Sequence, residues 1–490
     1  MDTTNPAHPD RPESAENAEA PAITVDLAVS QQKYLPAGGG VQELHAVVTV
    51  RVGGAAGAVP GPALAEVLVV DCSSSMDRPP EKFREAKKAA VAALQLLPDG
   101  TPFTVVAGTH EAAPAYPPGG AMALADDLTR AAATAAVHEL VAAGGTCLGR
   151  WLDLARRELA AQTAPIRHTL LLTDGRDEHG HFLPLAGVLD DCAGQFVCHA
   201  WGIGTDWDAR LLLDVAAALH GSADAVRVES DLAERYRTLM RALLAKTVPE
   251  LTVTVGALAP GAELRYVKQT FPHEKPMTPE PDEPGTYVTR AWGEELRRFH
   301  ICLTADPEGE LRDQDLLAAE VAVRLPAGSG VAPPAPQPLV VHWTDDPALS
   351  GLTDGQVAHA QVWEELGTAV ADATDAHARG QHDRAEALLG RAVALAHQAG
   401  ARRLLAELAR LVEIHDEDTG RVTLRSHVDP VDFQHLMTAS SHTTHGPDGS
   451  APAGPPRQGG ELVPCPRCRH RYPARSRYCG NCGGTMGASS

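Results

Sequence analysis

The sequence has no long hydrophobic run, and its positive charges are outnumbered. No stretch approaches the roughly 18 uninterrupted apolar residues of a membrane-spanning helix, so we expect none. Lys and Arg number 42 against 63 Asp and Glu, which gives a formal net charge of −21. Such an acidic balance repels phosphate backbones and disfavours nucleic acid as the main partner. We therefore expect no membrane contact and, at most, a local basic patch.

Cysteines are few and their number is odd: there are nine, and four of them lie in the last thirty residues. This distribution fits one metal site in a reducing compartment better than a disulfide framework. Residues 1–22 have neither the basic start nor the apolar core of a signal peptide. They are rich in Pro, Ala, Asp and Glu, so they cannot offset the entropy of ordering and are predicted to be a disordered tail. We predict a cytoplasmic protein.

The length of 490 residues predicts three or four domains. Strand-like alternation of apolar residues covers residues 23–60 and returns over residues 250–344. Because a pair of strands is not stable alone, we expect the early strands to join the later ones in one β-sandwich. The intervening residues 64–245 would then be an insertion into that sandwich. Residues 352–437 are Ala- and Leu-rich and predict a helical bundle, followed by a flexible linker at residues 438–460.

Residues 64–245 have the pattern of a doubly wound, Rossmann-like α/β domain. Short apolar runs alternate with longer helical segments, and the runs lie at residues 64–70, 103–107, 168–173 and 196–203. Continuous apolar runs are typical of parallel strands that are covered on both faces. This order therefore predicts a parallel sheet with helices on both sides.

Oxygen-bearing side chains follow two of these strands. The D-x-S-x-S motif of Asp71, Ser73 and Ser75 comes directly after the first strand, and Thr173-Asp174-Gly175 ends the strand at residues 168–173. Between them in the chain, Gly144-Gly145-Thr146 enters a helix. Because ligand sites in α/β folds lie at the carboxyl ends of strands, these side chains are expected to converge. Hydroxyl and carboxylate oxygens suit Mg²⁺, which would keep a position for one more anionic oxygen from outside.

This set of motifs, D-x-S-x-S, G-G-T and T-D-G, resembles the metal-ion-dependent adhesion site of von Willebrand factor A domains. The resemblance covers about residues 64–245. It implies that Mg²⁺ or Mn²⁺ is coordinated, directly or through water, by Asp71, Ser73, Ser75, Thr146 and Asp174. It also implies that the ion binds an Asp or Glu of a partner protein. The whole layout is similar to that of actinobacterial A-domain proteins associated with stress and tellurite-resistance systems.

The C-terminal segment contains two C-x-x-C pairs, Cys465 with Cys468 and Cys479 with Cys482. Four thiolates suit tetrahedral Zn²⁺, and so short a segment builds no core without a metal. Residues 461–484 therefore resemble a structural zinc ribbon. A redox dithiol is the alternative, but such pairs normally belong to a thioredoxin-like βαβ unit.

Together these features predict a non-catalytic adaptor that uses Mg²⁺ to capture an acidic residue of a partner protein. One alternative is a Mg²⁺-dependent hydrolase, chiefly a phosphatase. It is disfavoured because Ser73 stands where the D-x-D motif of such enzymes has a second carboxyl group as general acid. A second alternative is a nucleic-acid-associated regulator that acts through the arginines of the zinc ribbon.

Overall fold

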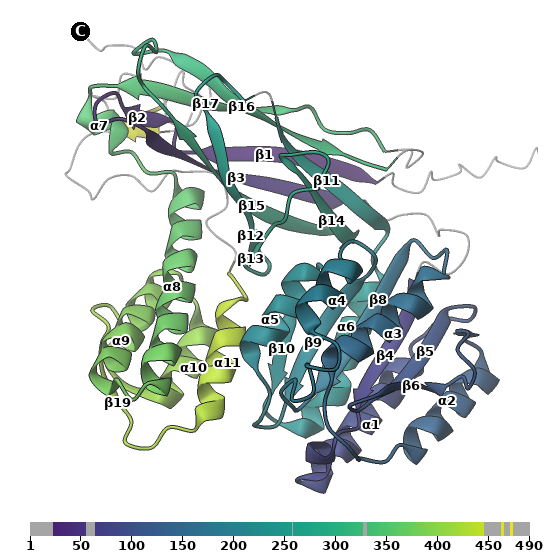
Figure 1. Cartoon of the computed structure of the whole chain (residues 1–490). Helices are drawn as coiled ribbons and strands as arrows, with labels where there is room; N and C mark the ends of the chain where they lie inside the picture. The colour runs from purple at the N-terminus through teal and green to yellow at the C-terminus, as the bar shows by residue number, and fades with distance from the viewer. Residues whose placement is uncertain are drawn as a thin grey trace, which may run out of the picture.

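A computed structural model describes residues 23–54, 64–256, 258–326, 331–444, 462–464 and 471–473. Figure 1 shows an α/β domain, a β unit of two sheets and a helical bundle. The predicted tail at residues 1–22, most of the predicted linker and the four cysteines of the predicted zinc ribbon lie outside the described residues. Short strands β20 (Leu462–Pro464) and β21 (Arg471–Pro473) pair antiparallel within that ribbon.

The α/β domain is built on a seven-stranded sheet of order β10-β9-β8-β4-β5-β6, with β7 paired to β5. Its strands are β4 (Leu64–Asp71), β5 (Pro102–Gly108), β6 (Ala112–Tyr116), β7 (Ala123–Leu124), β8 (Ile166–Thr173), β9 (Val197–Ile203) and β10 (Ala223–Val226). The four predicted strands are confirmed as β4, β5, β8 and β9. They pair in parallel, whereas β6 and β7, which were not predicted, add antiparallel pairs at the β5 edge.

Helices cover both faces of this sheet because its central strands are apolar on both sides. One face packs against α1 (Pro80–Leu94), α2 (Asp127–Glu139) and α6 (Leu232–Leu244), and the other against α3 (Leu148–Ala160), α4 (Leu185–Cys192) and α5 (Ala209–Ala218). In β4, Leu68 and Val70 face the first set, whereas Val67 and Val69 face the second. Two short 3₁₀ turns, η1 (Ser74–Asp77) and η2 (Glu229–Asp231), precede α1 and α6.

The β unit combines strands from before and after the α/β domain. One sheet has the order β1 (Thr24–Gln31), β3 (Gln42–Gly53), β15 (Glu295–Ala305), β12 (Glu263–Phe271) and β13 (Lys275–Pro276). The other has the order β14 (Thr286–Trp292), β11 (Val248–Gly256), β16 (Asp315–Arg324), β17 (Gln337–Thr344) and β2 (Tyr34–Pro36). The inward side chains of the two sheets share one apolar core. The α/β domain lies in the chain between β3 and β11.

The helical bundle contains α8 (Gly355–Ala378), α9 (His382–Gln398), α10 (Arg402–Leu411) and α11 (Pro430–Ser440), preceded by the short α7 (Pro347–Ser350). A hairpin that the sequence analysis did not predict, β18 (Val412–Asp416) with β19 (Arg421–Leu424), lies between α10 and α11. The linker was predicted to start at residue 438, but α11 continues to Ser440, and the Thr443 hydroxyl donates to Thr270 O at 2.6 Å. The sequence Thr438-Ala439-Ser440 is small and polar and so resembles a linker, but these residues are buried, and the Thr438 and Ser440 hydroxyls donate to carbonyls of their own helix.

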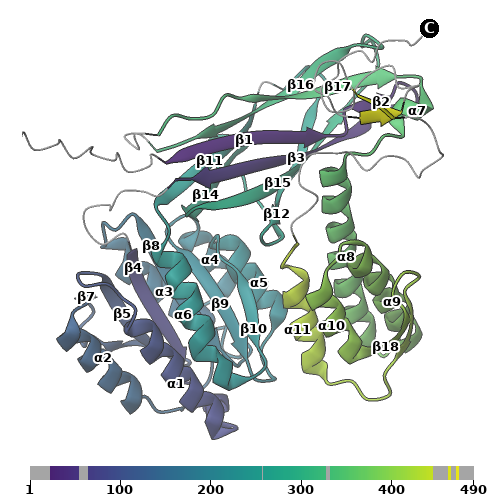
Figure 2. The ribbon, with the colours of Figure 1, turned by 180° about the vertical axis from the view of Figure 1, so that it is seen from behind.

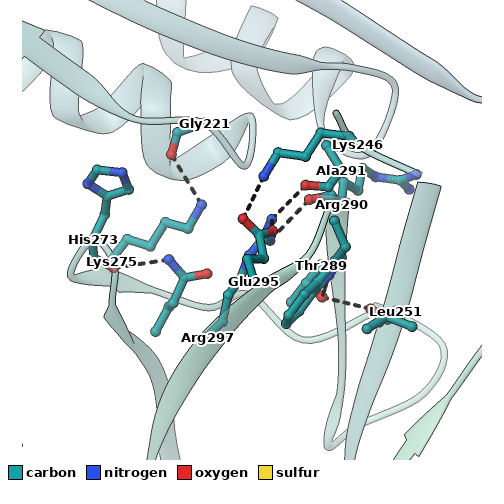
Figure 3. Close-up of polar contacts among 12 residues, drawn as sticks. Gly221, Lys246, Leu251, His273, Lys275, Thr289, Arg290, Ala291, Glu295 and Arg297 are labelled. Carbon is teal, nitrogen blue, oxygen red and sulfur yellow. Dashed lines mark hydrogen bonds and ion pairs between the residues drawn. The ribbon is translucent and has the colours of Figure 1, made fainter. Parts of the chain in front are cut away.

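The three units contact one another in pairs. Figure 2 shows α11 beside the α/β domain and α8 reaching the β sheets. At the contact between the β unit and the α/β domain, Lys275 Nζ donates to Gly221 O at 3.3 Å, and Lys246 is paired with Glu295 at 2.6 Å (Figure 3). Among the described residues, no helix is both long and apolar enough to cross a membrane.

Candidate functional site

The predicted site residues lie where β4 and β8 end. Asp71 is the last residue of β4, and Ser73 and Ser75 belong to the turn that leads through η1 to α1. Asp174 directly follows β8, the parallel neighbour of β4. Because neighbouring parallel strands end at the same edge, the two acidic side chains are brought together from positions far apart in the chain.

Short hydrogen bonds connect these side chains into one cluster. Ser73 Oγ lies 2.9 Å from Ser75 Oγ, and Ser75 Oγ donates to Asp174 Oδ1 at 2.8 Å. Asp71 Oδ1 accepts from the Ser73 amide at 2.8 Å, and Asp71 Oδ2 accepts from the Thr173 hydroxyl at 2.6 Å. The structure therefore brings together four of the five predicted ligands through direct hydrogen bonds, with Thr173 as a positioning residue.

The fifth predicted ligand, Thr146, reaches the cluster through glycines. A Cβ atom at Gly175 would lie 3.0 Å from Thr146 Oγ1, so the glycine of the T-D-G motif leaves room for the hydroxyl beside the residue that follows Asp174. On the other side of Thr146, a Cβ atom at Gly145 would lie 2.1 Å from the His179 ring. The Thr146 carbonyl accepts from the His179 amide at 2.8 Å. Thr146 is buried between these two loops.

Asp71 is unusually costly to keep charged here. Asp71 and Asp174 are both 0% exposed. Burial, together with repulsion from Asp174, raises the pKa of Asp71 to about 6, although hydrogen bonds from Ser73 and Thr173 oppose the shift. A cation placed between the carboxylates would remove the repulsion and offset the desolvation.

Lys82 of α1 supplies a cation to one of the two carboxylates, Asp174, and was not predicted from the sequence. Its ammonium group pairs with Asp174 Oδ2, and the side chain is buried. Gly204, which has φ +74°, makes room, because a Cβ atom there would lie 2.9 Å from Lys82 Cδ. A lysine in the first turn of a helix opposes the helix dipole. This unfavourable position of Lys82, eleven residues after Asp71, is the feature of the sequence that could have indicated its role.

The cluster fits a small hard cation. Two oxygen ligands at right angles around Mg²⁺, each near 2.0–2.1 Å, are about 3.0 Å apart. The Ser73–Ser75 and Ser75–Asp174 oxygen separations of 2.9 and 2.8 Å match such edges. Asp71, Ser73, Ser75, Thr146 and Asp174 supply only carboxylate and hydroxyl oxygens, the donor set that Mg²⁺ and Mn²⁺ prefer.

The site lies at the end of the sheet away from the β unit. A small pocket between the α/β domain and the β unit is lined by Ile166 and Val197, which begin β8 and β9, and by Pro249 and Arg290 of the β unit. The β unit therefore contacts the amino ends of these strands, whereas the cluster lies at their carboxyl ends (Figure 1). The β unit therefore does not cover the edge of the sheet at which the cluster lies.

Comparison with known proteins identifies the family. Residues 66–225 match the model of the von Willebrand factor type A domain. A solved structure, von Willebrand factor type A from Catenulispora acidiphila, is 36% identical with a TM-score of 0.78 and covers 87% of this chain and 99% of that chain. This chain belongs to the von Willebrand factor type A family. The likeness to the Catenulispora protein extends well beyond the α/β domain.

A curated relative, an uncharacterised protein of Synechocystis sp. (strain ATCC 27184 / PCC 6803 / Kazusa), is 30% identical over 207 residues. The match takes in 41% of this chain and 46% of the relative, so the chain spans about half of the relative's length. Domains of this family generally take part in metal-dependent protein interactions.

Proposed function

We propose that this protein is a non-catalytic adaptor whose α/β domain captures an acidic residue of a partner protein through a divalent cation. Mg²⁺ or Mn²⁺ would be held by Asp71, Ser73, Ser75, Thr146 and Asp174. The observation that carries the proposal is the cluster of mutually close oxygens at the carboxyl edge of the sheet. The predicted zinc ribbon, with Cys465, Cys468, Cys479 and Cys482, would be a separate structural Zn²⁺ site, and the cytoplasm remains the predicted location.

The charges of the site favour an acidic partner. Asp71 and Asp174 together carry two negative charges, and Lys82 carries one positive charge. A dication adds two positive charges, so the site with its ion has a net positive charge in a buried setting. Neutral serine and threonine oxygens offset little of it. A carboxylate from another protein would complete both the coordination and the charge balance.

Calorimetric titration of Mn²⁺ into the chelator-treated full-length protein tests the cation. We expect one equivalent at this site, lost in Asp71→Ala and in Ser75→Ala. Ser74→Ala is the matched control, because the Ser74 hydroxyl bonds the Gly144 carbonyl and is exposed. Equal heats for Asp71→Ala and the unmodified protein would refute the metal site.

Capture of a partner is tested separately by a pull-down from the native host in Mg²⁺ and in EDTA, read by mass spectrometry. We expect proteins that are retained only with Mg²⁺ and only when Asp71 is intact. An assay of phosphate release from generic phosphomonoesters separates the adaptor from a phosphatase. We expect the full-length protein in Mg²⁺ to release no phosphate. Release that disappears in Asp71→Ala would instead support the enzyme.

A further inference from the structure

A second group of side chains of metal-ligating types lies on the outer face of the β1-β3-β15 sheet. Ligand atoms of Glu43, His45 and Cys302 all lie within 4.8 Å of one another. Glu43 and His45 come from β3, and Cys302 comes from the neighbouring strand β15. In the register of the two strands, Cys302 is directly opposite His45, and Thr304 is opposite Glu43.

Strand alternation explains why these side chains share a face. Leu44, Ala46 and Leu303 point inward to the apolar core between the two sheets. Their neighbours Glu43, His45 and Cys302 must therefore point outward. Glu43 is exposed, His45 is half-buried and Cys302 is fully buried, so the group has a closed side at the sulfur and an open side at the carboxylate.

The hydrogen bonds of His45 leave one of its nitrogens facing the other two ligands. His45 Nδ1 lies 3.1 Å from His300 Nε2, and His45 Nε2 lies 3.3 Å from Glu43 Oε2. His45 Nδ1–H can donate a hydrogen bond to His300 Nε2. In that tautomer His45 Nε2 carries a lone pair directed at Glu43.

His300 continues the chain of contacts to another unit. Its Nδ1 lies 3.9 Å from Glu364 Oε2 of α8, and Glu364 is in turn paired with Lys268 of β12. Metal-bound histidines typically have their second nitrogen held in this way by an outer partner, which fixes the ring and its tautomer. Burial, together with the charge of Glu43, raises the pKa of the Cys302 thiol to about 11, and a hydrogen bond with the Tyr266 hydroxyl opposes this shift only in part.

We propose that Glu43, His45 and Cys302 form a Zn²⁺ site with one open coordination position on the outer face of this sheet. Sulfur, imidazole nitrogen and carboxylate oxygen are the protein ligands of Zn²⁺. In a tetrahedral site the nitrogen and oxygen ligands are about 3.4 Å apart, close to the 3.3 Å between His45 and Glu43. Binding requires the Cys302 thiol to release its proton, so the site strengthens as pH rises. The open position faces solvent on the Glu43 side and would hold water or an external anion.

Cobalt substitution tests this site without interference from the other two predicted ones. The protein used is the full-length chain in which Cys465, Cys468, Cys479 and Cys482 are replaced by serine. Co²⁺ at the Asp71 cluster has only oxygen ligands and gives no sulfur-to-metal charge-transfer band. We expect Co²⁺, added in excess so that the Asp71 cluster is also filled, to produce that band in the near ultraviolet with the intensity of one site per chain, and Zn²⁺ to abolish it by displacement.

The variants assign the band to the proposed ligands. Cys302→Ser is expected to remove it, whereas Cys192→Ser, which alters a buried thiol in the α/β domain, keeps it. Glu43→Gln changes an exposed side chain, leaves the fold intact and is expected to weaken Co²⁺ binding at least tenfold. Absence of the band with excess Co²⁺, or its persistence in Cys302→Ser, would overturn the proposal.

Discussion

At the scale of single residues, Lys82 is the most informative side chain near the candidate site. It is buried against Asp174, so one of the two site carboxylates already has a cationic partner in the protein itself. A metal ion that binds there must share Asp174 with an ammonium group. The site is therefore expected to bind a dication less tightly than the same oxygens would without the lysine.

Replacing Lys82 by methionine keeps the length and the apolar stem of the side chain and removes the charge. We expect Lys82→Met to raise the affinity for Mn²⁺ at least tenfold, which is about 1.4 kcal/mol. In EDTA the variant should melt at a lower temperature than the unmodified protein, because Asp174 is left buried and unpaired. Mn²⁺ should restore the melting temperature.

Lys88→Met is the control for this experiment, because Lys88 is on the same helix but exposed and paired with Glu85. It should change neither the affinity nor the melting temperature measurably. An unchanged Mn²⁺ affinity in Lys82→Met would show that the ammonium group and the ion do not act on the same carboxylate.

The site residues that were predicted are recognised from their neighbours in the sequence, whereas those that were missed depend on contacts between distant segments. Asp71, Ser73 and Ser75 lie within five consecutive residues, and the strand before them is an apolar run. The sequence pattern alone therefore indicates them. The contact between Lys82 and Asp174 depends on how α1 and the turn after β8 meet in space. The group of His45 and Cys302 depends on the register of β3 with β15, which no local pattern specifies.

At the scale of elements, the start of α5 shows how the helical bundle joins the α/β domain. Asp208 accepts hydrogen bonds from the amides of Arg210 and Leu211, at 2.9 and 3.3 Å. The amide of Ala209 instead donates to the Gln434 side chain of α11 at 2.8 Å. Free amides at the first turn of a helix are thus satisfied from two units. Trp207 and His435 pack edge to face beside them, with ring centroids 5.5 Å apart.

Asp208→Ala removes the cap of α5 from within the α/β domain. We expect it to lower the free energy of unfolding by about 1 kcal/mol, as for other helix caps, and urea denaturation measures this loss. Asp208→Asn should retain most of the stability, because the amide oxygen still accepts from the same backbone groups. If both variants lose the same amount, the charge of Asp208 and not its role as a cap stabilises α5.

At the scale of the whole molecule, the contact between the β unit and the α/β domain contains a buried, poorly compensated cation. Within the described part of the chain Lys275 donates to a backbone carbonyl, and its burial, with repulsion from Arg297, lowers its pKa from 10.5 to about 7 (Figure 3). The nearby titratable groups are mostly basic: His199, His220 and His273 all feel the charge of Lys275. Glu295 is paired with Lys246 and Arg297.

The sign of the pH effect follows from the lowered pKa. Between about pH 7 and 10.5 the unfolded chain keeps the proton that the folded Lys275 loses, so the stability contribution of this residue rises with pH. Below pH 7 both states are protonated, and the cost of the buried charge is complete. Lys275→Met should therefore be more stable than the unmodified protein at pH 6, by on the order of 2 kcal/mol. The difference should shrink toward pH 9.

Denaturant unfolding at several pH values measures this difference. Lys268→Met, in the neighbouring strand β12 and partly exposed, is the control and should show no comparable trend. A constant gap between Lys275→Met and the unmodified protein from pH 6 to 9 would contradict the lowered pKa.

The three pairwise contacts have a mechanical consequence. Lys275 joins the β unit to the α/β domain, Gln434 joins that domain to the bundle, and Glu364 joins the bundle back to the β unit. Because each unit is held by contacts with both of the others, it cannot rotate about one contact without breaking another. If a partner binds at the carboxyl edge of the α/β sheet, as proposed, these contacts would hold it at one orientation toward the outer face of the β1-β3-β15 sheet.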